Sequence, residues 1–125
     1  MEDAQLVERN ILKLAGDTRP ILTGEQTSTT RSGLRRYTLG SALLVDGRRE
    51  IRIFVTMLEV LLFRNLGRQH ASTEGYTNVF AMMSKIRKHY PRIKDGDQVT
   101  YVRFELVEDN QAEAQPRRRF GRFGR

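Results

Sequence analysis

Few side chains in this sequence have the type and spacing that catalysis or metal binding requires. His70 lies in a polar stretch and His89 at the basic end of an expected helix, without the spacing of a zinc pair, and the chain has no cysteine. Asp95 and Asp97 flank Gly96, but an EF-hand loop needs more carboxylates and a closing Glu. We therefore expect two ordinary surface histidines, a simple turn between the aspartates, no metal and no cofactor.

Motifs for nucleophilic catalysis and for phosphate loops are also missing from the sequence. Ser41 in "LGSAL" lacks the following glycine that a nucleophile elbow requires. Neither G-x-x-x-x-G-K-[ST] nor G-x-G-x-x-G occurs. The sequence thus predicts a protein that is not an enzyme and has no catalytic residues.

Positive charge is the main chemical feature of the chain. Lys and Arg total 22 against 15 Asp and Glu, which gives a net charge of +7. Arginine predominates, and its planar guanidinium binds phosphate bidentately. The body residues that we expect to contact nucleic acid lie at a hairpin and on a helix: Arg48, Arg49, Arg52, Lys85, Arg87 and Lys88. The sequence leaves open whether these groups form one continuous surface.

The last ten residues, "PRRRFGRFGR", hold five arginines and no acid, so residues 1–115 keep seven minus five, or +2. Arginine contacts phosphate, phenylalanine stacks on bases, and glycine lets the backbone follow an irregular single strand. This composition resembles arginine/glycine-rich RNA-binding segments. The predicted tail contacts are Arg117, Arg118, Arg119, Arg122 and Arg125 to phosphate and Phe120 and Phe123 to bases. A solubilising end or a nuclear-import signal are the alternatives for this tail.

The elements that must position these side chains begin with an expected helix over residues 2–15, where apolar residues recur at helical spacing. Residues 21–33 are rich in Thr and Ser, and we expect a strand at their start followed by a flexible polar stretch. The N-terminus is acidic and the longest apolar run, "VLLF", is short. We therefore expect an intracellular protein, cytoplasmic or nuclear, that is not secreted and has no membrane partner.

A β-hairpin is predicted around Asp46-Gly47, which lies between two runs rich in β-formers. A tight type I′ turn would place Leu43 opposite Glu50. The far end of the second arm, "MLEVLLFRNLG", fits either a longer strand or the start of a helix.

A polar loop, a second helix and a last strand are expected to follow the hairpin. Apolar residues from Tyr76 to Tyr90 recur at helical spacing, and Pro91 ends the helix. Residues 98–107 alternate as a half-buried strand does. The predicted organisation is one domain over 1–107, an acidic linker over 108–115 and a disordered basic tail over 116–125.

These elements predict an α+β fold: an antiparallel sheet built around the Asp46-Gly47 hairpin, with the N-terminal helix and the second helix packed on it. We interpret the protein as a non-enzymatic binder of RNA or single-stranded DNA with low sequence specificity, working as a homo-oligomer. A compact body with an arginine-rich arm resembles the layout of small viral capsid and nucleocapsid proteins and of RNA-binding accessory proteins. The alternative is a structural or adaptor subunit that works by protein–protein contact.

Overall fold

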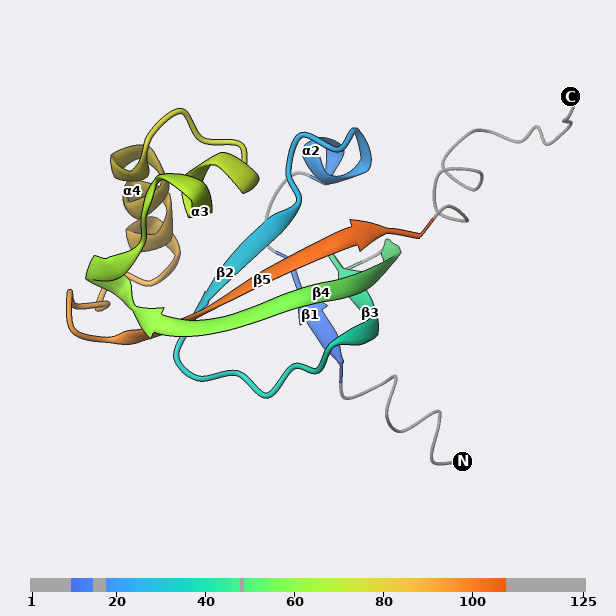
Figure 1. The fold of residues 1–125 in the computed structure, drawn as a ribbon, viewed down its shortest axis with the longest axis horizontal. Coiled ribbons are helices and arrows are strands. Elements are labelled where there is room, and N and C mark those ends of the chain that lie inside the picture. Colours follow the sequence, from blue (N-terminus) through green and yellow to red (C-terminus); the bar gives the residue numbers. More distant parts are fainter. Residues whose placement is uncertain (1–9, 15–17, 48, 108–125) are drawn as a thin grey trace, which may run out of the picture.

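The computed structural model describes residues 10–14, 18–47 and 49–107, which form a five-stranded sheet and three α-helices (Figure 1). In chain order the elements are β1 (Ile11–Lys13), α2 (Arg19–Leu22), β2 (Ser28–Ser32), β3 (Gly40–Val45), β4 (Glu50–Leu62), the 3₁₀-helix η1 (Phe63–Asn65), α3 (Arg68–Thr73), α4 (Val79–His89) and β5 (Gln98–Leu106). The strands lie in the order β1-β3-β4-β5-β2. Because β1 is parallel to β3 and all other neighbours are antiparallel, the sheet is mixed.

The longest strand of the sheet, β4, alternates in burial along its first half and contains an irregularity that bends it. Ile51, Ile53 and Val55 are buried at every second position, as expected where one face of a strand covers a core. The register against β5 shifts between Val55 and Met57, and such a bulge adds bend and twist to a strand. Figure 1 shows β4 and β5 as a long curved pair, and the whole sheet is a curled half-barrel.

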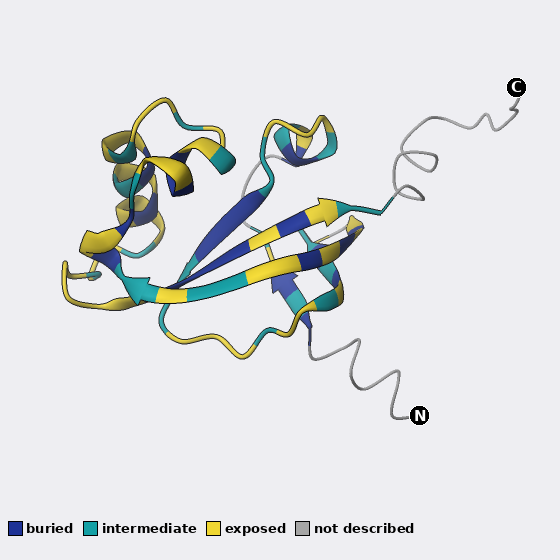
Figure 2. Ribbon diagram, in the orientation of Figure 1, coloured by how far each residue is buried: buried dark blue, intermediate teal, exposed yellow. Residues whose placement is uncertain are grey.

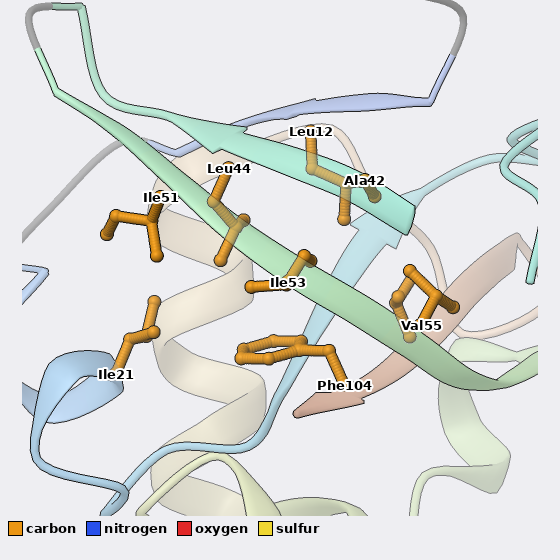
Figure 3. Close-up of a cluster of buried hydrophobic side chains, with 9 residues drawn as sticks. Leu12, Ile21, Ala42, Leu44, Ile51, Ile53, Val55 and Phe104 are labelled. Carbon is orange, nitrogen blue, oxygen red and sulfur yellow. The ribbon is translucent and has the colours of Figure 1, made fainter. Parts of the chain in front are cut away.

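Two apolar clusters lie on the sheet, and buried residues concentrate along its strands (Figure 2). One cluster joins β1, β3, β4 and β5 to Ile21 of α2 (Figure 3). Its buried members are Leu12, Ile21, Ala42, Leu44, Ile51, Ile53, Val55, Val102 and Phe104. The other cluster packs α3 and α4 against η1 and the start of β5, with Phe63, Met82 and Ile86 buried. These helices and β2 together frame the candidate site.

The predicted fold class, an antiparallel sheet covered by an N-terminal helix and a second helix, is wrong. Residues 2–9 and 15 of that helix lie outside the described residues, but Ile11–Lys13 is a strand paired in parallel with β3. Buried Asn10 donates from Nδ2 to the carbonyl oxygens of Thr38 and Ser41, each at 2.9 Å. These long-range bonds hold the segment extended, and a three-residue strand is too short to show its own period.

The two strands that flank Asp46-Gly47 pair antiparallel, as predicted, but in a register two residues away. Val45 faces Glu50 and Leu43 faces Arg52, so four residues lie between the paired positions. The Asp46 side chain accepts from the Arg49 backbone N–H at 2.8 Å, and Gly47 takes a φ of +97°. The carboxylate thus closes a wider turn than a two-residue I′ loop.

The other predicted elements have mixed outcomes. The second helix and the last strand are confirmed as α4 and β5, and the Asn78 side chain caps α4 by accepting from the Ala81 N–H. The segment "MLEVLL" continues β4 rather than starting a helix. Residues 21–33 show the reverse of the expected order, with the end of α2 first and β2 after it. No helix in the described part is long and apolar enough to span a membrane.

Candidate active site

The site is built on β2, a strand that buries polar side chains. Ser28, Thr29 and Thr30 are all nearly inaccessible, and the strand forms the sheet edge beside β5. Thr is β-branched and favours extended backbone, so "STTRS" forms a strand although it lacks apolar alternation. Buried hydroxyls need hydrogen-bond partners, and the end of α3 supplies them.

Glu74, directly after α3, is the first of these partners. The Thr30 hydroxyl donates to its Oε2 atom across 44 positions of sequence. Gly75 follows with a φ of +86°, the left-handed conformation that lets a chain leave a helix end. Burial raises the pKa of Glu74 to about 7, against the opposing effects of the Thr30 bond and the Arg31 charge. A carboxyl group with such a pKa exchanges protons near neutral pH.

Thr73 ties the end of α3 to the sheet. Its hydroxyl donates to the His70 carbonyl oxygen at 3.1 Å, which leaves the oxygen free to accept. Ser28 Oγ lies 2.7 Å from Thr73 Oγ1, and the Tyr101 hydroxyl oxygen lies 2.6 Å from the same atom. The Thr27 N–H also donates to the Thr73 carbonyl at 2.7 Å. This set of bonds fixes the backbone next to Glu74 relative to β2.

His70 is buried and has a structural role, whereas the sequence predicted a surface position. It is buried within α3, where the Gly67 N–H donates to Nδ1 at 2.9 Å. Nε2 therefore carries the proton and donates to Glu59 Oε1 at 3.0 Å. Its ring also meets Tyr101 edge to face at a centroid distance of 4.5 Å. In the described ranges no group of three or more acidic or histidine side chains is arranged to hold a metal.

A cavity of about 790 Å³ opens beside β2 and is lined by both Thr30 and Glu74. Its walls include Thr29, Thr30, Arg31 and Glu74, with Tyr76 and Lys85 from the α4 region. This volume lies in the range of about 300–1,000 Å³ that small-molecule sites occupy. Convergent polar groups and a carboxyl with a shifted pKa inside one cavity are the usual marks of an active site.

Arg31 adds a positive charge with unused donors to this cavity. Its Nη1 donates to the Lys13 carbonyl oxygen, which holds the guanidinium beside β1. The Nε and Nη2 atoms are buried and have no hydrogen-bond partner among the described residues. These two donors form the side edge of the guanidinium fork, which is suited to an oxygen or nitrogen acceptor.

The predicted nucleic-acid contacts are only partly brought to this cavity. Lys85 lines it, and Lys88 is exposed on the same helix. Arg87 instead pairs with Asp95 at 3.2 Å and lies 4.8 Å above the Phe63 ring. Arg49 and Arg52 are exposed at the β3–β4 hairpin, which lies toward the opposite end of β4 from α4 (Figure 1).

Several predicted residues cannot be placed. Arg48 lies outside the described residues, as do the acidic linker over 108–115 and the whole tail: Arg117, Arg118, Arg119, Phe120, Arg122, Phe123 and Arg125. Their roles, and the domain limits at 107 and 115, stay predictions. Glu74, Thr29, Thr30 and Arg31 were not predicted as site residues, and the one available signal was a Thr-rich stretch too polar for an ordinary strand.

Comparison with solved structures defines the class of fold. An ASCH domain from Lactobacillus crispatus superposes with a TM-score of 0.65 at 14% identity, over 78% of this chain and 79% of that chain. A protein from Enterococcus faecalis described by the family model DUF984 gives a TM-score of 0.61 at 16% identity, with the same coverage. No family model matches the sequence itself. The described residues therefore have the ASCH-domain fold.

Sequence similarity gives the family. The N(4)-acetylcytidine amidohydrolase of Moritella marina is 30% identical over 94 residues, which cover 71% of this chain and 84% of that protein. This chain therefore belongs to the N(4)-acetylcytidine amidohydrolase family.

Family membership corrects the functional interpretation of the sequence. The prediction of a non-enzymatic binder, with viral capsid or adaptor protein as its variants, is wrong because the family is named for a hydrolase. No local motif in the sequence indicates a hydrolase, because the candidate site combines β2 with the end of α3. The expected nucleic-acid partner is supported only at the level of its chemical class, because the relative's name contains a modified nucleoside. The homo-oligomer stays a prediction.

Proposed function

We propose that this protein hydrolyses the N4-acyl amide of acetylated cytidine, releasing acetate and cytidine. The observation that carries the proposal is the Glu74 carboxyl, with a pKa near 7 and held by Thr30 in a nucleoside-sized cavity. The Moritella marina relative is named for this reaction. Amide hydrolysis needs one group that first removes and then returns a proton, and a carboxyl with this pKa does both near neutral pH.

In the proposed reaction Glu74 removes a proton from a water molecule that attacks the acyl carbon. The water oxygen becomes part of acetate, the C–N bond breaks, and Glu74 returns its proton to the departing N4 amine. Arg31, with its unused donors, and Thr29 lie in the same cavity walls and donate to the acyl and C2 carbonyl oxygens of the substrate. Thr30 keeps one Glu74 oxygen oriented by its hydrogen bond.

Acetylated cytidine is a nucleoside of RNA, so the predicted nucleic-acid partner is proposed to be RNA. RNA, or a product of its breakdown, is the proposed source of the substrate. We retain the intracellular location and the homo-oligomer as proposals. The exposed apolar residues Phe54, Met57 and Val60 on β4 support an interface between copies.

A direct assay tests this function. Purified protein is incubated with N(4)-acetylcytidine, and cytidine is separated and quantified over time at pH 8. We expect turnover by the natural chain and a loss of about 10²- to 10⁴-fold in kcat/KM for Glu74→Gln, the range for removal of a general acid–base. Glu105→Gln, an exposed carboxylate on β5, is the matched control and should keep full activity.

Two outcomes would contradict different parts of the proposal. If the natural chain releases no cytidine, the proposed reaction is wrong. If Glu74→Gln retains the natural rate, the reaction stands but Glu74 is not its acid–base group.

A further inference from the structure

The cavity has a cationic wall that amide hydrolysis does not require. Lys85 and His89 both line the cavity and are exposed. They lie four positions apart on α4, so their side chains stand on one face of the helix, one turn apart. Neither has a hydrogen-bond or ion-pair partner among the residues that the structure describes.

The other basic residues of α4 differ from this pair. Arg87 is engaged by Asp95 and by the Phe63 ring, and Lys88 is not part of the cavity wall. Positive charge near the end of a helix is favoured by the helix dipole, which is enough to explain residues 87 and 88. Lys85 lies before the last turn of α4 and, like His89, lines the cavity, which the helix dipole does not explain.

Aromatic residues lie in the same cavity as Lys85 and His89. Tyr76 and Tyr90 are half-buried, contribute to the apolar cluster beneath α4, and line the cavity. Burial, and after it the charge of Glu74, raises the pKa of Tyr76, which places this phenol within the electrostatic reach of the proposed acid–base group. A hydrolytic carboxyl, aromatic rings, and a lysine beside a histidine match the three parts of a nucleotide: the acylated base, its planar ring and a phosphate.

We propose that Lys85 and His89 bind a phosphate group on the ribose of the acetylated cytidine, so that the preferred substrate is a nucleotide unit rather than the free nucleoside. The proposal rests on the proposed function for the identity of the base. The phosphate belongs either to a mononucleotide or to an RNA strand, and the two sources present the same charge to α4.

Binding measurements test this proposal without relying on turnover. The Glu74→Gln protein is titrated calorimetrically at low salt with N(4)-acetylcytidine, its 5′-monophosphate, its 3′-monophosphate and a short RNA carrying one acetylated cytidine. We expect at least one monophosphate to bind about tenfold more tightly than the nucleoside, the gain from one or two charge-assisted hydrogen bonds. Lys85→Gln, added to Glu74→Gln, should remove this preference while nucleoside affinity stays the same.

Control variants distinguish a specific phosphate site in the cavity from non-specific attraction by the positive charge of α4. Lys88→Gln removes the same charge from the same helix but away from the cavity, and it should leave the phosphate preference intact. His89→Gln should reduce the preference by a smaller factor than Lys85→Gln. An RNA that binds more tightly than both monophosphates identifies the strand as the source, and equal binding identifies the mononucleotide.

Two results would overturn the phosphate site. One is equal affinity for nucleoside, monophosphates and RNA; the other is an equal loss of preference from Lys85→Gln and Lys88→Gln. Neither result bears on the hydrolysis of N(4)-acetylcytidine by the natural chain. Conversely, a phosphate preference in a protein without hydrolytic activity would contradict the proposed function and leave the phosphate site in place.

Discussion

β4 and β2 are strands of one sheet, yet they bury opposite kinds of side chain. β4 directs Ile51, Ile53 and Val55 into the apolar cluster. β2 buries Ser28, Thr29 and Thr30 at the sheet edge instead. Burial of apolar surface stabilises the fold by about 25 cal/mol per Å², whereas a buried hydroxyl contributes little beyond what its hydrogen bonds return.

The two strands therefore serve different purposes: β4 stabilises the fold, and β2 holds the candidate site. The apolar cluster around β4 holds the curled sheet together and contributes no group that transfers protons. The polar strand contributes to stability only through partners such as Thr73, but it holds an ionisable carboxyl in a buried position.

The largest expected effect is a loss of stability from the apolar side. Phe104 is 3% exposed and packs in the cluster shown in Figure 3. Phe104→Ala should lower the free energy of unfolding by about 4 kcal/mol, because buried Phe-to-Ala changes leave a cavity. Urea denaturation measures this change. The rate of cytidine release per folded molecule, assayed under conditions where both proteins are folded, should stay within about twofold, since Phe104 does not line the active-site cavity.

Phe54→Ala provides the matched control for this prediction. Phe54 lies on β4 but is 50% exposed, and its removal should cost less than about 1 kcal/mol. Equal losses from the two variants would mean that the apolar cluster is not what stabilises the sheet.

A second, smaller effect is a gain in stability from a substitution at the polar site beside β2. The pKa of Glu74 is raised from 4.5 to about 7, so the folded state keeps a proton that the unfolded chain releases between these values. Unfolding free energy therefore falls as pH rises through this window and stays lowered above it. Glu74→Gln, which resembles the protonated form, should be more stable than the natural chain by on the order of 2 kcal/mol at pH 8.

The same variant supplies its own control when pH is lowered. Near pH 4 both chains are neutral at position 74, and their unfolding free energies should converge in urea denaturation. A variant that abolishes activity while raising stability would show that the site costs the fold stability. If Glu74→Gln were less stable at pH 8, its carboxylate would be stabilised by the fold and the buried-acid interpretation would be wrong.

The same contrast explains which parts of the molecule could be predicted from the sequence. The strands of the hairpin, α4 and β5 follow apolar periodicity, because their side chains meet a core. Their details depend on distant contacts: Phe80 fits the helical pattern but is 78% exposed, while Met82 is buried. The hairpin register likewise depends on how β3 and β4 meet their other neighbours.

The site could not be predicted because none of its signals is local. β2 has no apolar alternation, and its buried hydroxyls depend on Thr73 and Glu74, which lie 45 and 44 positions from their partners in β2. Glu74 in "STEG" looks like any loop carboxylate until Thr30 and the cavity surround it. The basic clusters, which are visible in the sequence, contributed Lys85 to the cavity wall but did not identify the reaction.

The smallest expected effect is a shift of the pH profile caused by one hydroxyl. The Thr30 bond lowers the pKa of Glu74 against the effect of burial, and the charge of Arg31 does so to a lesser degree. Thr30→Val removes the bond while keeping the β-branched shape, so the pKa of Glu74 should rise above its natural value. The acidic limb of the kcat/KM profile should move to higher pH, while Thr30→Ser, which keeps the hydroxyl, should leave it in place. Arg31→Gln should move the limb the same way but less, and a limb unmoved by Thr30→Val would show that the titrating group is not held by β2.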